Sequence, residues 1–112
     1  EEFHVPSKLL ALHESQDYGD YAITDEQGHK TVPLAFLASN HTTGGNSGSP
    51  VINAKGELIG TNFDRIWEGT MSDINFDSSR CRNISLDVRY TLWIIDKFAG
   101  AGYLLKEMKL IN

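Results

Sequence analysis

The sequence predicts a mostly β domain with flanking helices that ends in a helix. Short apolar runs separated by turn residues fill the middle of the chain, between residues 31 and 63, as is typical of antiparallel strands. Apolar residues at helical spacing lie nearer the two ends, in residues 7–14 and 89–98. With 112 residues the chain has the length of one domain at most, since single domains commonly have about 100–150 residues.

The N-terminal part begins with a predicted helix. Pro6 suits a helix start, and residues 7–14 place three leucines toward a core: Leu9, Leu10 and Leu12. Residues 15–30 are polar and rich in turn formers, which predicts a loop. Residues 31–39 are apolar and β-prone, so we expect a strand in which Pro33 marks an edge or an entry point.

The middle of the chain predicts a β-hairpin. Residues 49–52 form a short, mainly apolar run, and residues 57–63 return as the partner strand. Between them, residues 53–56 form a turn that ends in Gly56, where a positive φ fits without strain.

The C-terminal part changes from loop to strand to helix. Residues 67–82 have mixed polarity and no period, which predicts a long surface loop, and residues 84–88 predict a last strand. Residues 89–98 have helical spacing, which Gly100 and Gly102 then end, and residues 103–110 predict a second helical stretch. If the remainder of the protein is absent, we expect the apolar side chains of the helix at residues 89–98 to be exposed or self-associated: Trp93, Ile94, Ile95 and Phe98.

Composition excludes several classes of function. A net charge of -5 argues against nucleic acid, because phosphate binding needs a basic face. No stretch approaches the roughly 20 apolar residues that a membrane span needs. The single cysteine, Cys81, predicts a packed or partly exposed structural thiol. The histidines have no metal-ligand spacing, so we expect neither a metal nor a cofactor. Those histidines are His4, His13, His29 and His41.

The segment that carries chemistry is residues 42–50, Thr-Thr-Gly-Gly-Asn-Ser-Gly-Ser-Pro, directly before the hairpin. A serine nucleophile needs a tight turn and nearby backbone donors, and glycines on both sides of Ser47 meet that need. Gly45 lets its own N–H and that of Ser47 point at one spot as an oxyanion hole, while Gly48 leaves room for substrate. A plain glycine-rich turn remains the alternative. A phosphate-binding loop and an α/β-hydrolase elbow are excluded, because a strand follows and not a helix.

The run from Gly45 to Pro50, continued through residues 51–60, resembles the active-serine segment of chymotrypsin-fold peptidases. More narrowly, several separated blocks between roughly residues 35 and 108 resemble the C-terminal end of the bacterial dipeptidyl peptidases seven and eleven. These blocks are 42–60, 63–65, 67–69, 87–90 and 95–101. The resemblance implies that residues 1–112 are a C-terminal fragment of the catalytic domain: the active-serine half of a chymotrypsin-like double β-barrel, followed by a C-terminal helix.

The resemblance also assigns roles to single residues. It implies that Ser47 is the acyl-accepting nucleophile and that Gly45 and Ser47 supply the oxyanion donors. Arg65 follows the serine by 18 positions, where an arginine marks family members that cut after Asp or Glu and a glycine marks those that prefer apolar residues. Asp64 matches the position that helps to hold the free α-amino group of the substrate. Alternatively, Arg65 is a solvated charge at a strand end and Asp64 is its salt-bridge partner.

A guanidinium in a pocket suits this task on physical grounds, because it holds a carboxylate through two parallel charge-assisted hydrogen bonds. A serine peptidase also needs a base and an orienting carboxylate, which precede the serine in such folds. None of the four histidines stands in a suitable context, so we expect the remainder of the polypeptide to supply both groups and this fragment to be inactive alone. The resemblance further implies peptide substrates with a free N terminus and an acidic second residue, a homodimer and the periplasm.

Two rival functions remain open. An endopeptidase of the same fold would use Arg65 to bind an internal acidic residue of its substrate. A non-catalytic binding module would use the glycine-rich loop to bind an anion and the C-terminal helix as a docking face.

Overall fold

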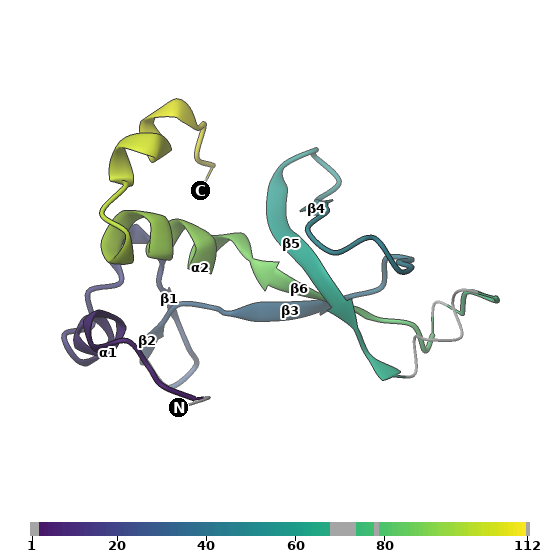
Figure 1. The fold of residues 1–112 in the computed structure, drawn as a ribbon, viewed down its shortest axis with the longest axis horizontal. Helices are drawn as coiled ribbons and strands as arrows, with labels where there is room; N and C mark the ends of the chain where they lie inside the picture. Colours follow the sequence, from purple (N-terminus) through teal and green to yellow (C-terminus); the bar gives the residue numbers. More distant parts are fainter. Residues whose placement is uncertain (1–2, 68–73, 78, 112) are drawn as a thin grey trace. The chain divides into compact units, whose positions relative to one another are not determined.

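The computed structural model describes residues 3–67, 74–77 and 79–111, and its chain divides into two compact units (Figure 1). Unit 1 combines Glu1–Pro33 with Arg89–Asn112, and unit 2 is Leu34–Val88. The fold mixes helices with two small sheets, so the coarse prediction of strands in the middle and helices toward the ends is confirmed. In the part of the chain that the structure describes, no helix has the length and apolar character of a membrane span.

Unit 1 begins with helix α1 at Ser7–Glu14, as predicted, although Leu10 is exposed and does not face a core. The segment predicted as a loop contains a short 3-10 helix at Gly19–Tyr21 and a small hairpin of β1 (Ile23–Thr24) and β2 (Lys30–Thr31). The Asp25 side chain closes this hairpin, because its Oδ1 accepts hydrogen bonds from the backbone N–H groups of Gln27 and His29 at 2.9 and 2.8 Å.

The core of unit 1 is aromatic: Tyr18, Tyr21 and Trp93 are buried together. The Tyr18 and Trp93 rings meet edge to face at 5.8 Å, and the Trp93 Nε1–H donates to the Asp17 carbonyl at 2.9 Å. Trp93 is therefore only 4% exposed, and the expectation that its helix leaves it uncovered is wrong. The reason is that residues 17–21, which were predicted as a loop, pack against it.

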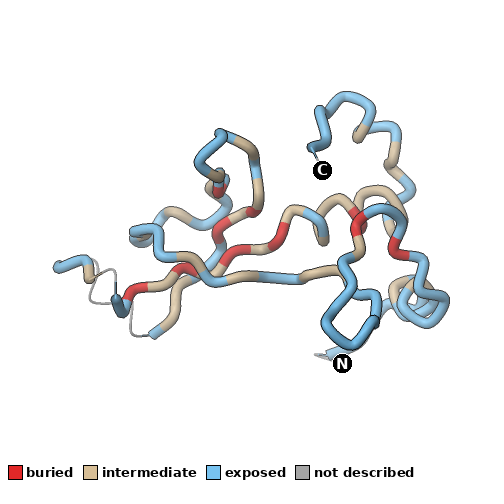
Figure 2. Tube along the Cα trace, turned by 180° about the vertical axis from the view of Figure 1, so that it is seen from behind, coloured by how far each residue is buried: buried red, intermediate tan, exposed pale blue. Residues whose placement is uncertain are grey.

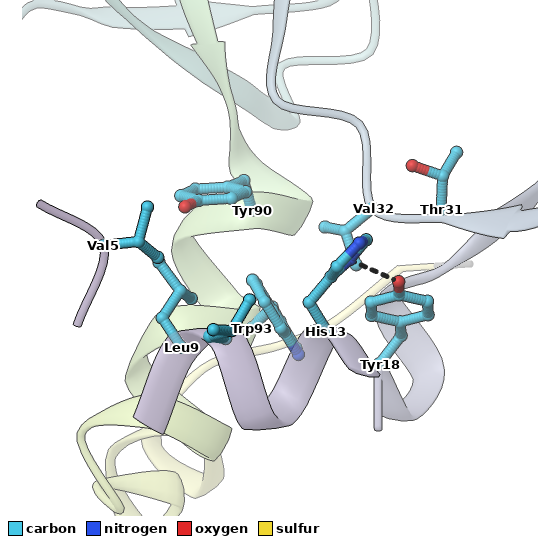
Figure 3. A pocket seen from close by; sticks show the side chains of 9 residues that line it. Val5, Leu9, His13, Tyr18, Thr31, Val32, Tyr90 and Trp93 are labelled. Carbon is cyan, nitrogen blue, oxygen red and sulfur yellow. Dashed lines mark hydrogen bonds between the residues drawn. The ribbon is translucent and has the colours of Figure 1, made fainter. Parts of the chain in front are cut away.

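A hydrogen bond links this core to the helical residues that follow Trp93, since the Tyr21 hydroxyl donates to the Asp96 carboxylate at 2.9 Å. Burial, followed by this hydrogen bond and the charge of Asp96, raises the pKa of Tyr21 to about 12. Beside the core lies an open, mainly apolar pocket of about 330 Å³. The His13 ring projects from α1 toward the Tyr18 hydroxyl there, and the His13 Nδ1 lies 3.0 Å from the hydroxyl oxygen (Figure 3).

The helix predicted for residues 89–98 is present, but its winding changes along its length. Helix α2 (Val88–Trp93) continues as a π-helix, η3 (Ile94–Phe98), in which the Ala99 N–H donates to the Ile94 carbonyl at 2.8 Å. Gly100, with a φ of +65°, then ends the helix. The second helical stretch is a 3-10 helix, η4, at Gly102–Glu107, and is shorter than predicted.

Unit 2 is a four-stranded antiparallel sheet in the order β3-β6-β5-β4 (Figure 1). Its strands are β3 (Ala35–Ala38), β4 (Pro50–Ile52), β5 (Leu58–Arg65) and β6 (Asn83–Asp87). The predicted hairpin of β4 and β5 is confirmed. The predicted strand at residues 31–39 is two separate pieces, because Thr31 belongs to β2 of unit 1 and pairing with β6 begins only at Ala35. Its edge position is confirmed.

The predicted surface loop at residues 67–82 lies partly outside the described residues, which omit 68–73 and 78. Its described residues 74–77 and 79–82 form turns and irregular backbone. Cys81, at the end of this segment, is buried.

One face of the unit 2 sheet buries polar side chains. Buried and half-buried residues alternate along β6 (Figure 2), and the buried ones are Asn83, Ser85 and Asp87. Asn62 of β5 is buried on the same face, where it pairs with Ser85. Gly60 also lies there, with the Phe36 ring and the Leu86 carbonyl directly over its Cα.

Candidate active site

Ser47 lies on an exposed loop that leads into β4, and two glycines give this loop its shape. Gly45 and Gly48 have φ angles of +97° and +88°, which residues with a side chain rarely adopt. Asn46 closes the turn that begins at Thr43. Its N–H donates to the Thr43 carbonyl at 3.2 Å, and its Oδ1 accepts from the Thr43 N–H at 2.7 Å. The predicted tight turn around the serine is therefore present.

The Ser47 hydroxyl points toward β5, where its Oγ donates to the Phe63 carbonyl at 3.4 Å. Among the described residues this carbonyl is its one hydrogen-bond partner, and no imidazole hydrogen-bonds to it. The His41 ring packs against Phe76 at 4.7 Å instead. In the same described part of the chain, the N–H groups of Gly45 and Ser47 donate to no acceptor.

Backbone and side-chain bonds join the serine loop to β5 beyond the regular hairpin. The Gly48 N–H donates to the Asn62 carbonyl at 2.7 Å, and the Asn62 N–H donates to the Ser49 carbonyl at 2.9 Å. The Asn62 side-chain amide donates to the Asn46 carbonyl at 3.1 Å, and the Ser49 hydroxyl donates to the same carbonyl at 2.6 Å. The loop is thus anchored to a sheet strand on both sides of Ser47.

A β-bulge in β5 determines where Arg65 points. Asn62 pairs with Ser85, but Asp64 pairs with Ile84 and Arg65 with Asn83, so Phe63 is one extra residue on the β5 side. Since directly paired residues in an antiparallel sheet share a face, Arg65 lies on the face of Asn62 and Asn83. Without the bulge, alternation would place it on the opposite face.

Arg65 is half-buried and contacts the serine loop. Its Nη1 donates to the Thr42 carbonyl at 3.3 Å, so the predicted specificity residue contacts the loop that carries the predicted nucleophile. Asp64 is exposed and lies on the opposite sheet face, where its Oδ1 accepts the Arg65 N–H at 2.8 Å. The structure therefore brings Arg65 to the loop of Gly45 and Ser47 but turns the Asp64 side chain away from the face of Arg65.

Two features of this site were not predicted from the sequence: the bulge at Phe63 and the side-chain bond of Asn62 to the loop. The sequence does contain a signal for Asn62. Asparagine is depleted in strands, and here it occupies an inward position of an otherwise β-prone run. A buried amide at such a position indicates a specific hydrogen-bonding task.

A protein-family model, characterised relatives and a solved structure all match this chain. The family model for Peptidase S46 matches residues 1–110. The chain is 58% identical over 111 residues to an Asp/Glu-specific dipeptidyl-peptidase of Flavobacterium psychrophilum, covering 99% of this chain and 15% of the relative. It is 50% identical over 111 residues to dipeptidyl-peptidase 7 of Phocaeicola vulgatus, with the same two coverages.

A solved structure also matches. Porphyromonas endodontalis DPP11, crystallised in complex with the dipeptide Arg-Asp, superposes with a TM-score of 0.84 at 52% sequence identity. The match covers 96% of this chain and 15% of that chain. The chain thus spans about 15% of the length of the relatives that it matches.

Proposed function

Because the chain belongs to the Peptidase S46 family, we propose that it carries the active serine of a dipeptidyl peptidase that releases N-terminal dipeptides ending in Asp or Glu. In this proposal Ser47 is the nucleophile, and the N–H groups of Gly45 and Ser47 form the oxyanion hole. Arg65 binds the acidic side chain of the substrate. One observation carries the proposal: the half-buried Arg65 guanidinium hydrogen-bonds the Thr42 carbonyl of the serine loop at 3.3 Å.

The proposed reaction proceeds through an acyl-enzyme. Ser47 Oγ attacks the carbonyl carbon of the second substrate residue, and its proton passes to a general base. The peptide bond breaks, the leaving amine takes that proton, and the dipeptide remains as an ester on Ser47. A water molecule, deprotonated by the same base, then hydrolyses the ester and restores the hydroxyl. We assign the base and its orienting carboxylate to the remainder of the polypeptide, within a chymotrypsin-like double β-barrel.

Substrate selection follows from the charge of Arg65. A guanidinium that is partly removed from water gains most from a carboxylate that accepts two hydrogen bonds, whereas an apolar side chain leaves it without that partner. The net charge of -5 does not attract acidic peptides at long range. Selectivity is therefore a local property of the pocket. The Arg-Asp dipeptide bound to the DPP11 relative, which ends in an acidic residue, supports this assignment.

The remaining parts of the proposal concern the substrate amine and the assembly. Asp64 is exposed at the end of β5, where a carboxylate is accessible to the α-amino group of a peptide. Removal of dipeptides, and not internal cleavage, requires such an amine contact. A homodimer and a periplasmic location belong to the same proposal and rest on the family resemblance.

Covalent labelling tests the nucleophile. In the intact peptidase that contains this chain, Ser47→Ala should abolish labelling by a dipeptidyl phosphonate ending in an acidic residue. It should also lower kcat by at least about 10⁴-fold, because the acyl-enzyme cannot form. Ser79→Ala, which removes an exposed serine outside the loop, is the matched control and should be labelled like the wild type.

The same experiment separates the rival functions. If the wild-type protein is not labelled and cleaves no dipeptide substrate, the peptidase assignment is wrong and the binding-module alternative replaces it. If acetylating the N terminus of the substrate leaves kcat/KM unchanged, the protein is an endopeptidase, since a dipeptidyl peptidase needs the free amine.

A further inference from the structure

The carbonyl oxygen of Asn46, the residue before Ser47, accepts three hydrogen bonds. The donors are the Ser49 N–H at 3.0 Å, the Ser49 hydroxyl at 2.6 Å and the Asn62 side-chain amide at 3.1 Å. A carbonyl oxygen has two lone pairs, so this acceptor is fully used. The two donors from Ser49 come from the same loop, and only Asn62 joins this carbonyl to another strand.

This carbonyl belongs to the same peptide group as the Ser47 N–H. A peptide group is planar and trans, so its C=O and N–H point in opposite directions. Donors that hold the Asn46 oxygen toward β5 therefore hold the Ser47 N–H pointing away from β5. Hydrogen bonds to the oxygen also polarise the group, which makes its N–H a stronger donor. The orientation of this N–H matters because the proposed oxyanion hole uses it.

Asn62 is well suited to hold this peptide group. Its own backbone bonds to Gly48 and Ser49 at 2.7 and 2.9 Å, and its side chain is only 4% exposed. Its Oδ1 is buried and, among the described residues, has no hydrogen-bond partner. An apolar residue of similar shape would fill this position without leaving a polar atom unsatisfied. The donated bond to Asn46 is what an apolar residue could not supply.

We propose that Asn62 is a positioning residue, which orients the oxyanion-binding N–H of Ser47 through the Asn46 carbonyl. This inference rests on the proposed peptidase function. An oxyanion donor acts mainly when negative charge develops on the substrate oxygen, and loss of one typically costs about 10²–10³-fold in kcat. Loss of the Asn62 bond leaves the N–H in place but less well oriented, so we expect a smaller effect of about 10-fold.

The test uses Asn62→Leu in the intact peptidase, because leucine keeps the branching at Cγ and removes the donor. We expect kcat to fall about 10-fold and the Ki of a dipeptide aldehyde, which forms a tetrahedral oxyanion on serine, to rise by the same factor. KM and the Ki of the corresponding dipeptide alcohol should stay within about 2-fold, because neither complex places a negatively charged oxygen at the Ser47 N–H. Ser49→Ala, which removes the 2.6 Å bond to the same carbonyl, should give the same pattern and decides the question if Asn62→Leu does not fold.

Asn83→Leu is the matched control. Asn83 is 1% exposed on the same sheet face and also has a buried Oδ1 without a partner among the described residues, but its amide donates to Ser85. This variant should leave the ratio of aldehyde Ki to alcohol Ki unchanged.

Two results would overturn the inference. One is an unchanged kcat in both Asn62→Leu and Ser49→Ala, while the wild type cleaves dipeptides and is labelled at Ser47. The other is an equal loss in kcat, in substrate binding measured by KM and in affinity for the dipeptide alcohol, as general loosening of the sheet would cause. A wild type that neither cleaves nor is labelled refutes the proposed function, and the inference with it.

Discussion

Replacing Arg65 by methionine removes the guanidinium and its charge and keeps an unbranched apolar stem. In the proposed complex the guanidinium donates two hydrogen bonds to the substrate carboxylate, each worth about 1.5–3 kcal/mol when a charged group takes part. Arg65 is half-buried and already donates to Thr42, so the lower end of this range applies. Two bonds then contribute about 3 kcal/mol, which corresponds to a loss of about 10²-fold in kcat/KM for a substrate ending in Asp.

The assay compares kcat/KM for two fluorogenic dipeptide substrates with free N termini, one ending in Asp and one ending in Leu. We expect Arg65→Met to lower the Asp value about 10²-fold, while the Leu value stays constant or rises. Arg65→Lys should give an intermediate loss, since lysine keeps the charge and loses the two-pronged geometry. Arg80→Met removes an arginine whose side chain is 70% exposed, and this control should change neither value.

Two outcomes would refute this reasoning. An Asp-to-Leu ratio that does not change in Arg65→Met would show that Arg65 does not contact the acidic side chain. Equal losses on both substrates would show that Arg65 acts by supporting the serine loop through Thr42 and not by selecting the substrate.

Two predictions concern stability. Gly60→Ala should lower the melting temperature of the intact protein and destabilise it by about 1–3 kcal/mol, because the new Cβ would lie 2.6 Å from the Leu86 carbonyl oxygen and 2.7 Å from the Phe36 ring; a variant as stable as the wild type would mean that these groups move apart freely. Tyr21→Phe removes the hydrogen bond to Asp96 and should cost about 1.5 kcal/mol at pH 8. The pKa of Tyr21 is raised from 10.0 to about 12, so this contribution is fully present below pH 10 and is lost as the pH rises toward 12. The difference in melting temperature between wild type and Tyr21→Phe should therefore shrink between pH 10 and pH 12, and a constant difference would contradict the assignment.

The elements that could be predicted are those that depend on local chemistry. The β4–β5 hairpin follows from its turn, in which the Asn53 side chain accepts hydrogen bonds from the Lys55 and Glu57 N–H groups at 2.9 and 3.0 Å. Helix α1 likewise has the predicted bounds. In the site, the turn around Ser47 follows from its flanking glycines.

The parts that were missed depend on partners far away in the sequence. The apolar run at residues 31–39 looks continuous, yet Thr31 pairs with Ile23 and Phe36 with Ser85. Local propensity cannot show such a division, because both pieces are β-prone by themselves. The direction of Arg65 has the same origin, since the bulge exists only relative to the register of β6.

That bulge at Phe63 has a consequence for how this site can change over time. Two inward residues of a regular strand are separated by an even number of positions, but Asn62 and Arg65 are three apart. The one extra residue at Phe63, and not the chemistry of any one side chain, keeps Asn62 and Arg65 on one face. In the proposed complex, a point substitution at Arg65 alters which substrate side chain is bound, but it leaves position 65 on the face of Asn62. Loss or gain of a single residue between them would place the two side chains on opposite faces. By the proposed function, substitution at position 65 therefore changes the substrate preference, whereas insertion or deletion of one residue turns position 65 away from the serine loop.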